Sequence, residues 1–80
     1  MKIAVLGSGN GGCAVAAECA AHGHEVRLFD FDKFPGQIQA IQAAGGIRYA
    51  GIMEGFAPIA YAGHDLVEAT ADAELVYVVG

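Results

Sequence analysis

The residues best suited to chemistry form a glycine-rich loop close to the N-terminus: Gly7, Ser8, Gly9, Asn10, Gly11 and Gly12. This G-x-G-x-x-G pattern stands between an apolar run, residues 3–6, and an alanine-rich segment, which is the strand-to-helix setting that gives it meaning. In that setting Gly7 turns the chain, Gly9 lets the backbone approach a pyrophosphate, and Gly12 lets the helix lie close to the sheet. Free N–H groups at the start of the helix then bind phosphate.

An acidic residue completes the pattern. Asp30 follows Gly12 by 18 positions and ends a second strand-like run, residues 25–29. A carboxylate at that place accepts hydrogen bonds from an adenosine ribose and repels a 2′-phosphate. We therefore expect a dinucleotide site with NAD as cofactor, NADP being the less favoured alternative because Arg27 and Lys33 lie close in the sequence and a basic side chain could tolerate the phosphate.

The elements that must position these residues follow from apolar periodicity and from Gly, Pro and Asp signals. We expect strands over residues 2–6, 25–30 and 75–79, helices over residues 10–21, 35–44 and 66–71, and a β-hairpin within residues 47–61. The hairpin stands where a plain third strand would otherwise come. This order, β-α-β-α-β-hairpin-α-β, predicts an α/β fold with a partial Rossmann-type, doubly wound parallel sheet.

The last expected strand also bears on the site. Ligands of such sheets bind at the carboxyl ends of the strands. If strand 75–79 pairs with the first strand, Val79 and Gly80 lie beside Gly7, and we therefore expect both at the cofactor site.

Composition excludes several classes of protein. The 80 residues are 55% hydrophobic and 16% charged, with a net charge of −5 and only four scattered basic residues, so a nucleic-acid partner is not expected. No apolar run reaches membrane-spanning length. Cys13 and Cys19 lie six positions apart on one helix, on largely opposite faces, and are expected to be buried, inert thiols of a cytoplasmic protein.

The length sets the domain organisation. A complete dinucleotide-binding domain needs roughly twice 80 residues, so residues 1–80 are expected to be the N-terminal part of one. The remainder of that domain and a substrate domain are expected outside this chain. Oligomeric state cannot be inferred from these residues.

The sequence of these motifs is more specific than the general G-x-G-x-x-G pattern. The loop G-x-G-N-G-G at residues 7–12, followed by His-Gly-His-Glu-Val at residues 22–26 and Phe-Asp-Phe-Asp at residues 29–32, resembles the opine (octopine/nopaline) dehydrogenase family. The resemblance spans the whole chain but is specific only at the loop and around residues 22–32. Ketopantoate reductase and glycerol-3-phosphate dehydrogenase share the architecture, yet they usually lack asparagine followed by two glycines in the loop.

The resemblance implies an oxidoreductase that uses NAD(H). In that family an amino acid and a 2-keto acid condense to an imine, which the nicotinamide cofactor reduces by hydride transfer. The family's catalytic residues lie in a second, mostly helical domain, so none is expected among residues 1–80, and the 80-residue chain alone is expected to be inactive. One alternative is a reductase similar to ketopantoate reductase or glycerol-3-phosphate dehydrogenase. The other, from a different class, is a nucleotide-sensing domain that uses the same fold without hydride transfer.

Other candidate chemistry is thin. His22 and His24 flank the end of a helix and are interpreted as capping and surface residues, not metal ligands. His64 has no evident catalytic partner in the sequence. The carboxylates form no spaced pair of the kind that general acid–base catalysis needs, so neither a catalytic residue nor a metal site is predicted.

Overall fold

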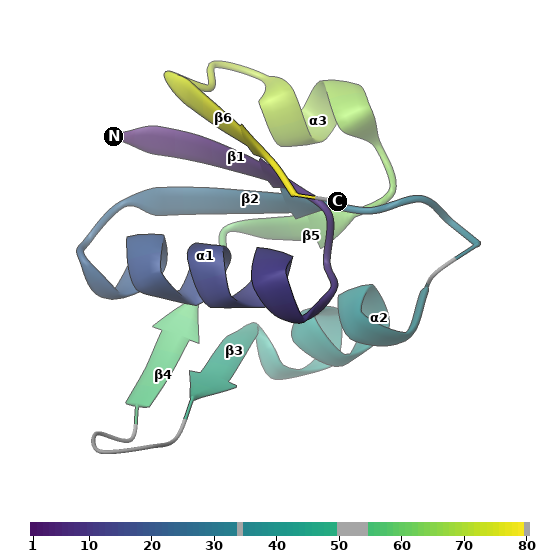
Figure 1. Ribbon diagram of the computed structural model, residues 1–80, viewed down its shortest axis with the longest axis horizontal. Helices are drawn as coiled ribbons and strands as arrows, with labels where there is room; N and C mark the ends of the chain where they lie inside the picture. The colour runs from purple at the N-terminus through teal and green to yellow at the C-terminus, as the bar shows by residue number, and fades with distance from the viewer. Residues whose placement is uncertain (34, 50–54, 80) are drawn as a thin grey trace.

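The computed structural model describes residues 1–33, 35–49 and 55–79. Its elements in chain order, drawn in Figure 1, are β1 (Lys2–Leu6), α1 (Asn10–Ala21), β2 (Glu25–Phe29), α2 (Pro35–Ala44), β3 (Gly46–Tyr49), β4 (Gly55–Pro58), β5 (Tyr61–Gly63), α3 (Leu66–Thr70) and β6 (Leu75–Val78). These bounds confirm the strands and helices predicted from periodicity to within one or two residues. The turn expected at residues 51–55 lies outside the described residues except for Gly55, which begins β4.

The main sheet has four parallel strands in the order β5-β2-β1-β6. Figure 1 shows α1 and α2 on one face of the sheet and α3 on the other. The chain moves outward from β1 through β2 to β5, then crosses back over the opposite face to place β6 on the free side of β1. The sheet is therefore doubly wound, as predicted, and its topological switch point lies between β1 and β6.

The third parallel strand differs from the prediction. The sequence suggests one continuous strand over residues 56–61, but β4 ends at Pro58, and Tyr61–Gly63 forms the separate strand β5, which pairs with β2. The hairpin β3–β4 is thus inserted before the third strand and does not replace it. Proline has no N–H to continue a ladder, which explains where β4 ends. A strand of three residues is too short to show a period.

The core lies between the sheet and the α1–α2 layer. Its largest fully buried apolar side chains are Val5, Val26, Leu28 and Ile38. Small residues of α1, such as Ala16, are also buried, so the helix lies close to β1 and β2. In contrast, all four residues of β6 are exposed, and among the described residues β6 pairs with β1 alone.

The predicted helix ends are confirmed. His22 is the C-cap residue of α1, and its Nδ1 atom lies 2.8 Å from the carbonyl of Glu18. Gly23 follows with a left-handed φ of 88°. Asp65 begins α3 by accepting the N–H of Glu68 at 3.1 Å. Both caps satisfy backbone groups that a helix leaves without internal partners.

The cysteines are only half-buried, not buried as the sequence suggests. The Cys13 thiol donates to the carbonyl of Ser8 at 3.2 Å. Burial, assisted by the negative charge of Asp30, raises the pKa of Cys13. A raised pKa keeps the thiol protonated and a poor nucleophile, in agreement with the interpretation of this residue as inert.

Candidate functional site

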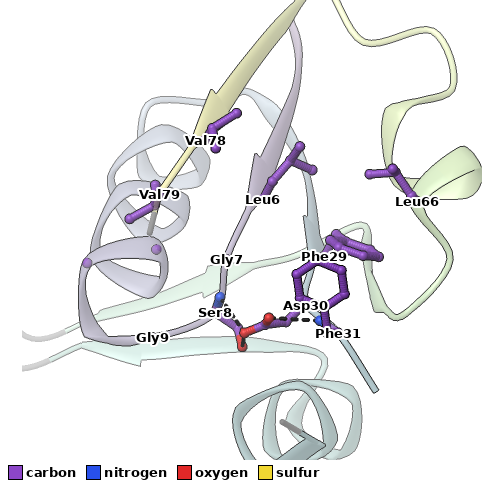
Figure 2. Close-up of a pocket in the computed structure, with 12 residues that line it drawn as sticks. Leu6, Gly7, Ser8, Gly9, Phe29, Asp30, Phe31, Leu66, Val78 and Val79 are labelled. Carbon is purple, nitrogen blue, oxygen red and sulfur yellow. Dashed lines mark hydrogen bonds between the residues drawn. The ribbon is translucent and has the colours of Figure 1, made fainter. Parts of the chain in front are cut away.

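A pocket of about 720 Å³ opens at the carboxyl ends of β1, β2 and β6. Its lining consists of Leu6, residues 7–9, 11 and 12 of the glycine loop, residues 29–31, and three apolar residues from α3 and from β6 and its end: Leu66, Val78 and Val79 (Figure 2). The pocket therefore lies at the topological switch point, where ligands of doubly wound sheets bind.

Two glycines of the loop are required by the protein itself. Gly7 has a φ of +122°, and a Cβ atom there would overlap the backbone carbonyl of Val79. A Cβ atom on Gly12 would overlap the backbone carbonyl of Gly7. Gly7 thus allows β6 to approach the turn, and Gly12 allows the first turn of α1 to approach the end of β1.

Gly9 is different, because a Cβ atom built on it would have no described protein atom within 4 Å. The N–H of Cys13 makes the first bond of α1 by donating to the carbonyl of Gly9 at 2.9 Å. The N–H groups of residues 10–12 precede that bond and are those that a helix leaves for an external acceptor. The space beside Gly9 and the start of α1 can therefore receive a phosphate.

Asp30 is joined directly to the loop. Its Oδ2 atom accepts the backbone N–H of Ser8 at 3.0 Å and the Ser8 hydroxyl at 2.6 Å (Figure 2). Its Oδ1 atom accepts the N–H of Phe31 at 2.8 Å. Ser8 is buried, with 2% of its surface exposed. Asp30 therefore binds the loop to the end of β2 as well as facing the pocket.

The charge of Asp30 is stabilised by these contacts. Desolvation raises the pKa of Asp30, but the hydrogen bonds from Ser8 and Phe31, together with the charge of His64, outweigh it and hold the pKa below its ordinary value. The Nδ1 atom of His64 lies 2.8 Å from the backbone carbonyl of Asp30. Asp30 is therefore a carboxylate at neutral pH.

Arg27 does not face the ribose position. Its Nη1 atom donates to the carbonyls of Glu68 and Ala71 at the end of α3, at 2.9 and 3.3 Å, and its Nε atom lies 3.4 Å from Glu25. The guanidinium group thus caps α3 and is engaged away from the pocket. Arg27 was one of the two basic residues that could tolerate the 2′-phosphate of NADP, and this contact removes it from that role.

The structure brings together most of the site residues predicted from the sequence. The glycine loop, Asp30 and Val79 lie around one pocket, with Asn10 contributing the first backbone position of α1. Gly80 lies outside the described residues. Sequence reasoning missed five pocket residues: Leu6, Phe29, Phe31, Leu66 and Val78. The neighbours of Asp30 could have been included from sequence position alone, whereas Leu66 reaches the pocket only through the crossover by way of α3.

Of the remaining histidines, His22 and His24 stay outside the site, whereas His64 lies against the backbone of Asp30. The Nδ1 atom of His24 lies 3.0 Å from the N-terminal amine, and neither residue lines the pocket. Within the described part of the chain, no group of three or more His, Cys, Asp or Glu residues is placed to hold a metal ion. No described helix is both long and apolar enough to cross a membrane.

A glycine loop between a parallel strand and a helix at a switch point, with a carboxylate at the end of the neighbouring strand, defines a dinucleotide-binding domain. The family model of the NAD-dependent glycerol-3-phosphate dehydrogenase N-terminus matches residues 2–79, and the chain belongs to this family. Members of this family are NAD-dependent dehydrogenases, and the cofactor is NAD, as Asp30 predicts. A comparison with curated proteins gives no significant match.

Proposed function

We propose that the pocket holds the adenosine and pyrophosphate part of NAD(H), with the pyrophosphate against Gly9 and the start of α1. The observation that carries this proposal is the contrast within one loop. At Gly7 and Gly12, backbone atoms of the protein occupy the space that a side chain would take, whereas at Gly9 that space is open. A glycine at residue 9 adds no side chain to that space, so a ligand can approach the backbone closely there.

The apolar pocket residues suit the adenine ring. Phe29 and Phe31 form an edge-to-face pair with ring centroids 5.5 Å apart, and Phe31 remains 61% exposed beside the pocket. Leu66 and Val78 line the same hollow (Figure 2). An exposed aromatic ring gains contact area when a flat base covers it. Phe31 is thus the residue that we place against adenine.

The carboxylate of Asp30 favours free ribose hydroxyls over a 2′-phosphate. Two negative groups at contact distance repel each other, and the Arg27 cation that could relieve the repulsion is held by α3. We expect NAD(H) to bind more tightly than NADP(H).

For the reaction, we propose reductive condensation of an amino acid with a 2-keto acid, as in opine dehydrogenases. The sequence Asn10-Gly11-Gly12, which resembles the loop of that family, supports this assignment. A Cβ atom on Gly11 would lie 3.3 Å from Cγ1 of Val79, which is tighter than ordinary contact. Gly11, the first of the two adjacent glycines in this loop, therefore lies close to the residue that follows β6. The groups that bind substrate and transfer protons would lie outside residues 1–80, and the protein would act in the cytoplasm.

The second candidate is a glycerol-3-phosphate dehydrogenase-type reduction, which the family match favours. It would use the same cofactor pocket with a keto phosphate in place of the imine. Ketopantoate reduction is a further member of this group of reactions. All three differ in the substrate and not in the residues described above.

The test uses the natural polypeptide at its full length and follows NADH oxidation. Pyruvate with a panel of amino acids is compared with each compound alone, with dihydroxyacetone phosphate and with ketopantoate. Turnover that needs both co-substrates supports the opine reaction. Turnover with dihydroxyacetone phosphate or ketopantoate alone overturns it in favour of the rival. Tight NADH binding without any turnover would instead support a nucleotide-sensing domain. Residues 1–80 alone should show no turnover with any of these substrates.

A further inference from the structure

Hydrogen bonds within the protein already occupy most of the acceptor positions of the Asp30 carboxylate. Three donors surround it: the N–H and hydroxyl of Ser8 on Oδ2, and the N–H of Phe31 on Oδ1. An ionised carboxylate offers about four acceptor positions, two on each oxygen. Both positions on Oδ2 are therefore taken, and one position on Oδ1 remains.

An adenosine ribose presents two hydroxyl groups at its 2′ and 3′ carbons, and each can donate one hydrogen bond. We propose that Ser8 is a specificity-determining residue of the ribose site: by filling Oδ2, its hydroxyl leaves Asp30 able to accept only one of the two ribose hydroxyls. The inference rests on the proposed function, because it assumes that the adenosine ribose lies at Asp30.

The hydroxyl of Ser8 is well placed for this role. Ser8 is almost fully buried, and the 2.6 Å distance from its Oγ atom to Oδ2 is that of a strong, charge-assisted hydrogen bond. A ribose hydroxyl that competed for Oδ2 would have to displace a buried donor and leave it unsatisfied. Ligand binding therefore leaves the Ser8 bond in place and uses Oδ1.

The first measurement compares three nucleotides on the full-length wild-type protein. Calorimetry gives the Kd of ADP, 2′-deoxy-ADP and 3′-deoxy-ADP. One deoxy nucleotide should bind about tenfold more weakly than ADP, because a hydrogen bond to a charged group is lost. The other should bind within about twofold of ADP. Equal weakening of both, or of neither, overturns the inference.

The second measurement uses Ser8→Ala, which removes the hydroxyl but keeps the backbone N–H bond to Asp30. One position on Oδ2 is then free, so the second deoxy nucleotide should also bind severalfold more weakly than ADP. A structural defect would weaken all three nucleotides alike and would leave their ratios unchanged, and that result counts against the inference.

A matched control removes the chain's only other aliphatic hydroxyl. The Oγ1 atom of Thr70 donates to the carbonyl of Leu66 at 2.8 Å, within α3 and away from the carboxylate. Thr70→Val should keep the wild-type ratios. If the wild-type protein binds neither ADP nor NADH, the proposed function fails and this inference with it. If both bind but the deoxy ratios differ from those stated, the inference alone fails.

Discussion

The two walls of the cofactor pocket are built in different ways. The polar wall, formed by the glycine loop and Asp30, is fixed by backbone contacts and by hydrogen bonds to both carboxylate oxygens. In the apolar wall, formed by Leu66, Val78 and Val79, Leu66 is 47% and Val78 80% exposed, whereas Val79 is half-buried against the core. The polar wall is therefore complete without a ligand, whereas the apolar wall still has surface to bury.

This difference separates stability from affinity. A change at Gly7, Gly12 or Asp30 in the polar wall disturbs groups that the protein itself needs, so it should alter folding as well as binding. A change at Leu66 or Val78, the exposed residues of the apolar wall, mainly removes contacts with the cofactor, so it should alter binding with little effect on folding. The predictions below test that separation.

The largest effect is expected for Gly12→Ala. The new Cβ atom would overlap the carbonyl of Gly7, and neither backbone can move without separating α1 from β1. The free energy of unfolding should fall by roughly 2–4 kcal/mol, measured by urea denaturation. Gly9→Ser is the matched control, since serine is a favourable residue at a helix N-cap and the space there is open. Equal destabilisation by both variants would contradict the difference between the two positions.

Gly9→Val should have the next largest effect, on binding. Its branched side chain would fill the space reserved for the pyrophosphate, and the affinity for NADH should fall on the order of 100-fold. Because valine is a poorer N-cap than glycine, the unfolding free energy should fall by up to about 1 kcal/mol. Near-normal affinity, measured by calorimetry, would show that the pyrophosphate lies elsewhere.

Asp30→Asn should cost roughly 1–3 kcal/mol of stability even without cofactor. Both oxygens of Asp30 face donors, so either orientation of the amide places its NH₂ group against an N–H of Ser8 or Phe31. Asp30→Ala, which removes the group altogether, is the comparison. Stability equal to wild type would mean that the loop does not depend on the charge.

The same residue gives a pH dependence. A pKa that is lowered in the folded state contributes stability that is present above the unfolded value, about 3.9, and is lost as pH falls through the folded value. The difference in stability between wild type and Asp30→Asn should therefore be constant near neutral pH. It should shrink as pH falls below about 4, as measured by urea denaturation at each pH. A difference that persists at the lowest pH would exclude the ionised carboxylate as its cause.

The smallest effect is expected in the apolar wall. Leu66→Ala should weaken NADH binding roughly threefold to tenfold, since a partly exposed side chain loses only part of its contact area. Val67→Ala, on the same helix but outside the pocket, should leave the affinity unchanged. Stability should change by no more than about 0.5 kcal/mol in either variant. Equal binding losses would place the cofactor away from Leu66.

The parts of the fold that could be predicted are those with local signals. β1 and α1 follow from an apolar run, a glycine loop and an alanine-rich segment, and Pro35 with the Gly45–Gly46 pair delimits α2. β5 could not be found because three residues cannot show a period, and its strand character comes from pairing with β2. Pro58 indicates an edge strand but does not show that a separate strand begins three residues later.

The candidate site shows the same limit. Glycine spacing and the position of Asp30 predict the polar wall, because a strand, a turn and a helix fix those residues relative to one another. The apolar wall depends on the crossover that carries Leu66 over the sheet and on the pairing that places Val79 beside Gly7. The bond between Ser8 and Asp30 joins residues 22 positions apart and is visible only in three dimensions.

Arg27 connects the polar and apolar walls through hydrogen bonds between β2 and α3. It lies on β2, the strand that leads to Asp30, and its guanidinium group holds the last turn of α3, the helix that carries Leu66. These hydrogen bonds of Arg27 thereby fix the distance between the Asp30 carboxylate and the Leu66 side chain. A cofactor that enters such a preformed gap does not have to order it, so the association should follow simple one-step kinetics, without a slow rearrangement.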